Sequence, residues 1–144
     1  MKQGAPERDY SGRDVVDKLG VRAGQAVALD ERAWELDGDL RGRILSRAHR
    51  PPASGGEPLD LVLVSVADTT DVVEVLRRWR VTLKPAGAIW LLSPKRGRPG
   101  YVDQRHLIAA GAEAGLVDNK SCSVSDAISA MRFVIRRRDR QSGP

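Results

Sequence analysis

The amino-acid sequence predicts an α/β fold in three layers, with a mostly parallel open sheet between two layers of helices. Two apolar runs rich in Val, Leu and Ile, at residues 59–66 and 88–93, are typical of parallel strands that are covered on both faces. The segment after each run has helical periodicity, which is the alternation expected of strand–helix–strand units. The length of 144 residues fits a single domain spanning residues 1–144.

The first third of the chain predicts a helix, a strand and less regular segments. Residues 9–21 (DYSGRDVVDKLGV) are predicted to form a short amphipathic helix within an N-terminal helical segment, residues 1–24, with Ser11 and Asp14 as its cap and Gly20 at its end. A short apolar run at residues 26–30 predicts a buried strand. The segments that follow are predicted as a helix or ordered loop at 31–40, a second short strand at 42–49, and a Pro/Gly loop at 50–58.

The middle of the chain gives the clearest pattern. After the strand at 59–66, a helix is predicted with Thr70 or Asp71 as its cap. Its apolar stripe consists of Val72, Leu76, Trp79 and Leu83. Residues 84–87 (KPAG) predict a type I turn that leads into the strand at 88–93.

The last third predicts a basic loop, a helix and a pair of strands. Residues 94–101 are predicted as loop, and residues 102–115 as a helix capped by Asp103. Strands are predicted at 116–124 and 132–137, and residues 139–144 as a frayed tail. The connection between these two strands is too short for a parallel crossover, so one antiparallel strand is expected at the C-terminal edge of the sheet.

Residues 59–137 resemble the second half of the class I S-adenosylmethionine-dependent methyltransferase fold, through DLVLV, a helix, LKPAGAIWLL, a helix and two closing strands. Nearly the whole chain also resembles a family of small bacterial proteins known as a domain of unknown function. The segments that carry this resemblance are DYSGRDVVDKLGV, LDLVLVSV, AIWLLSPKRG and AAGAEAGLVDNKSCSVSDAISAMRFVIRR. The resemblance implies a degenerate Rossmann-like domain and brings no established activity with it.

The chain departs from this family at two places. The family usually has Trp-Pro-Lys-Lys where this chain has Ser93, Pro94, Lys95 and Arg96, and Thr and Trp where it has Ala127 and Ile128. An aromatic contact of the family is therefore expected to be absent here.

The motifs of methyl transfer are missing from the sequence. A class I methyltransferase needs a glycine-rich turn directly after its first strand, so that the backbone can approach the cofactor. In this chain no glycine follows Asp30 until Gly38, and the segment predicted as the second strand ends in Arg47, His49 and Arg50 instead of a carboxylate. S-adenosylmethionine is therefore not expected as a cofactor, and a reduced methyltransferase-like enzyme is kept as the alternative function.

Other catalytic chemistry is not indicated either. His49, His106 and Cys122 do not have the spacing of metal ligands, and no nucleophile-elbow motif surrounds a serine. We therefore predict a non-catalytic protein without a metal. No run approaches the roughly 20 apolar residues of a membrane span, and no signal sequence is visible, so a cytoplasmic location is expected.

The candidate binding site is a rim of basic and small residues at the carboxyl end of the predicted sheet, where ligands of open sheets bind. Its loop, residues 93–100, precedes a helix start that could attract an anion. The candidate ligand-binding residues are Lys95, Arg96, Arg98, Tyr10, Ser11 and Gly12. The expected partner is an anionic small molecule or a protein, while a solvated loop without a ligand remains the simpler interpretation.

The charge distribution also permits a polyanion as partner. Residues 73–144 hold 14 Lys and Arg against 6 Asp and Glu, and Arg136, Arg137, Arg138 and Arg140 follow the last strand. A charged edge strand also prevents aggregation without any ligand. With one Phe and two Tyr, the chain offers no stacking platform for bases. Nucleic acid is therefore possible but not favoured, and the sequence leaves the oligomeric state open.

Overall fold

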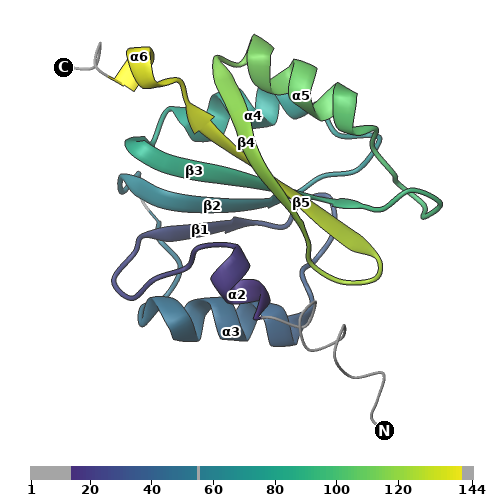
Figure 1. Ribbon diagram of the computed structural model, residues 1–144. Helices are drawn as coiled ribbons and strands as arrows, with labels where there is room; N and C mark the ends of the chain where they lie inside the picture. Colours follow the sequence, from purple (N-terminus) through teal and green to yellow (C-terminus); the bar gives the residue numbers. More distant parts are fainter. Residues whose placement is uncertain (1–13, 55, 141–144) are drawn as a thin grey trace, which may run out of the picture.

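Five strands form one mixed sheet in the order β1-β2-β3-β5-β4, with helices on both faces (Figure 1). The computed structural model describes residues 14–54 and 56–140. Along the chain the elements are α2 (Val15–Lys18), β1 (Val27–Asp30), α3 (Gly38–Ala48), β2 (Leu59–Ser65), α4 (Val72–Arg80), β3 (Leu83–Pro94), α5 (Gln104–Glu113), β4 (Leu116–Ser123), β5 (Ile128–Ile135) and α6 (Arg137–Arg140). The predicted α/β class and its Rossmann-like sheet are confirmed.

The directions of the strands follow from the lengths of their connections. β1, β2 and β3 are parallel neighbours joined by helical crossovers. β5 is antiparallel to both β3 and β4, because the four residues between β4 and β5 allow only a hairpin. The antiparallel pairing therefore lies at the C-terminal edge, as predicted. The C-terminal strand itself lies one place inside that edge, and β4 is the outermost strand.

Two buried clusters of side chains hold the layers together. α4 and α5 cover one face of the sheet, and α2 and α3 cover the other (Figure 1). On the α2–α3 face, Trp90 is fully buried and donates its indole N–H to the Leu19 carbonyl at 2.9 Å. On the α4–α5 face, Phe133 is fully buried against Gly111 of α5. The sheet thus separates two cores, and each packs one helical layer.

The short strand predicted at residues 42–49 is wrong, because this segment belongs to α3. The Asp37 side chain caps the helix by accepting a hydrogen bond from the Leu40 N–H at 3.1 Å. Leu40, Ile44 and Ala48 recur every four residues and are buried. That spacing places them on one helical face against the sheet, which decides the conformation. Residues 31–37 form an irregular loop.

The first helix and the tail differ in extent from their predictions. Asp14 caps α2 by accepting from the Val16 N–H at 3.0 Å, while Ser11 lies outside the described residues. Gly20 has φ +75°, the left-handed conformation expected after the helix. At the other end the chain is helical as far as Arg140, so the predicted frayed tail begins too early.

The type I turn predicted at residues 84–87 is replaced by an irregular part of β3. The Cα partners run from Leu59↔Leu83 to Leu61↔Ala88, so the intervening β3 residues bulge out of the ladder. At Gly87, a Cβ atom would lie 2.9 Å from the Leu59 carbonyl oxygen. Glycine therefore lets β3 pass close to the backbone of β2 and resume its pairing.

The Pro/Gly loop after α3 runs beside β1, which is the other outer strand. The Ala53 N–H donates to the Val27 carbonyl at 2.8 Å, next to Pro51 and Pro52. The loop thus satisfies an outward-facing carbonyl of β1. None of the helices in residues 14–54 and 56–140 has the length and apolar character needed to cross a membrane.

Candidate functional site

The carboxyl ends of β1 and β2 are covered by the loop of residues 31–37. The Trp34 backbone N–H donates to the Ser65 Oγ at 3.2 Å, and its indole N–H donates to the Val66 carbonyl at 2.9 Å. Both acceptors lie at the end of β2 or just after it. The Trp34 side chain therefore lies across the end of the sheet where open α/β folds bind ligands.

Glu31 fixes this loop from within. Its carboxylate accepts the Leu36 N–H at 2.8 Å and two guanidinium N–H groups of Arg41, at 2.6 and 3.1 Å. The hydrogen bond from Arg41, with a smaller contribution from the Leu36 N–H, holds the pKa of Glu31 below its ordinary value. The covering loop is thus tied to α3 by a bidentate ion pair.

Asp30, the last residue of β1, carries a buried carboxylate. One oxygen accepts the Trp79 indole N–H at 2.8 Å, and the other accepts the Arg32 backbone N–H at 3.2 Å. The Arg32 guanidinium lies 3.4 Å from the same carboxylate. These bonds join β1 to α4 and satisfy the buried charge, so Asp30 has a structural role.

This end of the sheet does not fit S-adenosylmethionine as class I methyltransferases bind it. Those enzymes place glycines after the first strand, where Cβ atoms would obstruct the cofactor. Here residues 31–37 contain no glycine. Trp34 lies at the position of the glycine-rich turn through which those enzymes approach the cofactor. The residues present hold the protein's own loop in that position.

The predicted basic rim lies in the loop between β3 and α5. Lys95 donates its backbone N–H to the Ala127 carbonyl at 2.8 Å and its ammonium to the Ser123 Oγ at 2.7 Å. The Arg96 guanidinium lies 5.2 Å from the centre of the Tyr101 ring. Arg98 belongs to the same loop. The other three predicted residues, Tyr10, Ser11 and Gly12, lie outside the described residues.

The start of α5 offers less to an anion than the sequence suggested. Asp103 caps the helix by accepting the Arg105 N–H at 2.8 Å. This backbone hydrogen bond, together with the Arg105 side chain and the charge of Arg96, lowers the pKa of Asp103. The helix end thus already has a carboxylate, and the positive charge available to a ligand is that of the rim side chains.

A pocket of about 270 Å³ lies between the first half of α5 and the β4–β5 hairpin. Hydroxyl, amide and apolar side chains line this serine-lined pocket: Gln104, Leu107, Ser121, Cys122, Ser123, Ser129, Ala130 and Met131. The bond from Lys95 to Ser123 places an ammonium group at its border. These serines are not among the residues predicted from the sequence. Their alternation on β4 was a visible signal, because alternate residues of a strand share a face.

A second pocket, of about 290 Å³, opens on the α2–α3 face near the end of β3 and is mostly apolar. Trp34, Leu36, Leu92 and Ile128 are among the side chains that line it. Ile128 lies at one of the two places where the chain departs from the family that it resembles. Among the described residues that line this pocket, Arg43 is the one cation; it is paired with Asp14 and Asp39, so it provides no spare positive charge for an anion.

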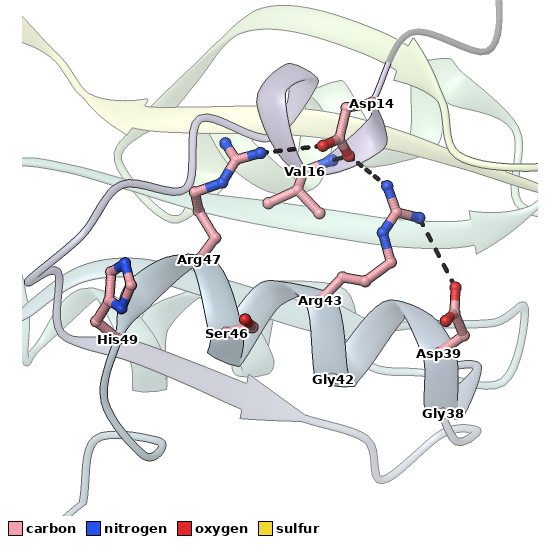
Figure 2. Close-up of a pocket in the computed structure, with 9 residues that line it drawn as sticks. All are labelled: Asp14, Val16, Gly38, Asp39, Gly42, Arg43, Ser46, Arg47 and His49. Atoms are coloured by element: carbon pink, nitrogen blue, oxygen red, sulfur yellow. Dashed lines mark hydrogen bonds and ion pairs between the residues drawn. The ribbon is translucent and has the colours of Figure 1, made fainter.

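A hollow of about 570 Å³ lies along the outside of α3 (Figure 2). The Asp14 carboxylate bridges Arg43 and Arg47 there, the latter at 3.0 Å, which ties the start of α2 to α3. Gly38 and Gly42 line the hollow, and the absence of side chains at these two positions deepens it. The charges lining this hollow are thus used to hold α2 in place. Within residues 14–54 and 56–140, no group of three or more metal-binding side chains occurs.

Comparison with known proteins gives a family and a fold. Residues 16–137 match the family described as "Protein of unknown function (DUF3052)". Uncharacterised proteins of Mycobacterium tuberculosis and Mycobacterium bovis are 31% identical, and each match covers 81% of this chain and 75% of the relative.

Solved methyltransferase structures share the fold at low sequence identity. A putative methyltransferase from Thermoplasma acidophilum has a TM-score of 0.60 at 10% identity, covering 95% of this chain and 77% of that one. A SAM-dependent methyltransferase from Aquifex aeolicus has 0.58 at 8% identity, covering 92% and 94%. Aeropyrum pernix fibrillarin, with natively bound S-adenosyl-L-methionine, has 0.53 at 13% identity, covering 81% and 69%. The structural similarity shows the fold alone, whereas the sequence match shows the family. The chain belongs to the DUF3052 family and has a methyltransferase-like Rossmann fold.

Proposed function

We propose that this chain is a non-catalytic binding domain that holds a small anionic molecule in the serine-lined pocket beside Lys95. The observation that carries this proposal is the hydrogen bond from the Lys95 ammonium to Ser123, at the border of a pocket rich in hydroxyl groups. A lysine and several hydroxyl donors are the groups that bind a carboxylate or a phosphate.

The charge of the rim supports an anion over a neutral ligand. In the part of the chain that the structure describes, Lys95, Arg96 and Arg98 form no ion pair with a carboxylate. Asp103 interacts with Arg96 through its charge, so most of the positive charge left for a ligand is that of Lys95 and Arg98. An anion in the pocket would gain a charge-assisted hydrogen bond from Lys95 and a favourable field from the other two residues.

The binding test uses inorganic phosphate and citrate as probes of phosphate and carboxylate recognition. In NMR titrations, we expect the largest changes in chemical shift at Lys95, Ser121 and Ser129. These changes should reach a plateau as the concentration of the probe rises. The double variant Lys95→Glu, Arg96→Glu should abolish these changes, because it replaces the attraction by repulsion. Native mass spectrometry of the freshly purified protein should show the bound natural ligand.

The matched control is Arg22→Glu, Arg77→Glu, which makes the same change of charge at two exposed positions outside the rim. This control should leave the titration unchanged. Equal loss of binding in both double variants would show that overall charge, not the pocket, attracts the anion, and would contradict the proposal.

The alternative function is a reduced S-adenosylmethionine-dependent methyltransferase. Because Trp34 and its loop lie across the end of β1 and β2, we expect calorimetry to detect no binding of S-adenosylmethionine. Micromolar binding would show that the loop moves aside and would favour the enzyme.

A further inference from the structure

A second positively charged site, separate from the serine-lined pocket, lies on the edge of the sheet beside α2. Its central residue is Arg132 of β5, whose Cα partners are Trp90 on β3 and Lys120 on β4. Paired residues of neighbouring strands point to the same side of a sheet. Because Trp90 is buried on the α2–α3 face, Arg132 and Lys120 project from that face as well.

The Arg132 side chain is half-buried, and its guanidinium keeps contact with solvent. It forms neither a hydrogen bond nor an ion pair within residues 14–54 and 56–140. Burial, and to a smaller extent the nearby charge of Arg140, lowers the pKa of Arg132 below that of a free arginine. A cation that loses hydration without gaining a partner lowers the stability of the fold.

Two further cations lie next to Arg132. Lys120 extends toward the end of α2, where its ammonium donates to the Lys18 carbonyl at 3.4 Å. Arg140 of α6 donates its Nε–H to the Ile135 carbonyl at 2.9 Å. Neither is paired with a carboxylate in the described part of the chain. We call Lys120, Arg132 and Arg140 the edge cation cluster. Within this cluster, the charge of Arg140 acts against that of Arg132.

We infer that the edge cation cluster binds the phosphodiester backbone of nucleic acid. A phosphate provides the acceptors that Arg132 lacks, in the bidentate geometry that arginine recognises. The three residues come from β4, β5 and α6 and line none of the pockets described above, so the proposed contact is with the backbone of a polymer and not with a small molecule in a cavity. Arg136, Arg137 and Arg138 continue the positive charge where β5 leads into α6 (Figure 1).

Two observations favour a nucleic-acid backbone over the alternatives. None of the residues that define the edge cation cluster is aromatic, and the neighbouring Trp90 is buried, so the cluster offers charge and not a surface on which bases stack. An acidic peptide added as a strand would pair with β4, but the register of β4 is interrupted between Asp118 and Lys120. The surface therefore fits a ligand that is recognised by its charge and not by strand pairing.

The test is fluorescence anisotropy with two labelled DNA duplexes of unrelated sequence, each of about 20 base pairs, over a series of salt concentrations. Both duplexes should bind with similar affinity at low salt. Lys120→Gln, Arg132→Gln should weaken binding at least about tenfold and make the slope of log K against log salt shallower by about 2, because two phosphate contacts are lost.

The control is Arg77→Gln, Arg105→Gln, which removes the same charge from exposed side chains of α4 and α5 on the opposite face. It should change the affinity less than about twofold at the same salt. Absence of DNA binding, an equal effect of the control, or equally tight binding of polyglutamate at the same salt would each overturn the inference.

A single substitution at Arg132 distinguishes weaker DNA binding through loss of a contact from weaker binding through loss of the folded structure. Arg132→Met removes the unpaired cation and keeps most of the side-chain volume, so it should raise the midpoint of urea unfolding and weaken DNA binding together. If this variant lowers the unfolding midpoint, Arg132 has a structural role, and the inference fails.

Discussion

Each of the three tryptophans donates its indole N–H to an oxygen in a different part of the chain. Trp34 donates to the Val66 carbonyl, Trp79 to the Asp30 carboxylate and Trp90 to the Leu19 carbonyl. The apolar rings would pack without these bonds, but the bonds set the direction in which each ring packs. Single residues thus join the covering loop, α4 and α2 to the sheet.

Trp90→Phe should lower the free energy of unfolding by about 2 kcal/mol, because it leaves a cavity and deprives the Leu19 carbonyl of its donor. The measurement is urea unfolding followed by far-UV circular dichroism. Val81→Ala is the control, since Val81 is 82% exposed and should change the free energy by less than about 0.5 kcal/mol. An unchanged unfolding midpoint in Trp90→Phe would contradict the importance of this bond.

Glu31 predicts a dependence of stability on acid pH. Because the folded state lowers the pKa of Glu31, chiefly through Arg41, its contribution is complete well above the ordinary value of 4.5. The contribution is lost as the pH falls below 4.5 through the lowered folded-state pKa. In Glu31→Gln the urea midpoint should therefore be lower than in the wild type near neutral pH, and the difference should shrink in acid. A constant difference at all pH values would exclude this origin.

Among the helices, α3 and α5 each contain a glycine in a contrasting environment. At Gly42 of α3 an added Cβ would meet no atom within 4 Å, whereas at Gly111 of α5 it would lie 2.4 Å from the Phe133 ring. The first glycine weakens its helix without a compensating contact. The second lets α5 approach the sheet closely enough to pack on Phe133.

The same substitution should therefore have opposite effects in the two helices. Gly42→Ala should raise the free energy of unfolding by about 1 kcal/mol through helix propensity. Gly111→Ala should lower it by about 1 to 3 kcal/mol, because the methyl group overpacks the core. Urea unfolding of the two variants side by side provides the comparison, and effects of the same sign would show that the two glycines do not differ in this way.

The elements that the sequence predicted well were those with an uninterrupted pattern. The apolar run of β2 and the cap of α4 needed only local information. The predicted stripe of α4 extended too far, because Leu83 belongs to β3. α3 was mistaken for a strand because Gly38 and Gly42 weaken its helical pattern, although Asp37 and the four-residue spacing after Leu40 were visible signals. The irregular start of β3 could not be predicted, since it depends on the register with β2.

The candidate sites follow the same distinction between local and distant information. Lys95 was predicted because it directly follows a clear strand. The hydroxyl groups around the serine-lined pocket come together only through the register that pairs Ser123 with Ser129. Lys120 and Arg132 are likewise brought opposite each other by the hairpin. Tyr10, Ser11 and Gly12 lie outside the described residues, so their role in ligand binding stays a prediction.

At the scale of the whole molecule, one sheet is shared by two separate cores. Val16 and Trp90 belong to the α2–α3 face, while Leu107 and Phe133 belong to the α4–α5 face. β3 contributes side chains to both cores in alternation. Loss of packing on one face therefore removes support from strands that the other face needs.

We expect the described domain to unfold in a single cooperative transition. Leu107→Ala should lower its stability by about 2 to 5 kcal/mol. It should shift tryptophan fluorescence and far-UV circular dichroism equally, because the fluorescence includes Trp34 and Trp90 of the opposite face as well as Trp79 of the same face. Val16→Ala is the corresponding change on the α2–α3 face. Two separated transitions, or a shift in only one signal, would show that the faces unfold independently.

The hydrogen bond from Ala53 to Val27 has a consequence for behaviour at high concentration. β1 ends the sheet on one side, and an unpaired outer strand is a template on which other chains can aggregate. The loop fills part of that template, and Pro51 and Pro52 have no N–H to donate to an incoming strand. At the opposite end, the interrupted register of β4 impairs the ladder that such a strand would extend. Both outer strands of the five-stranded sheet are therefore protected against edge-to-edge aggregation with another chain.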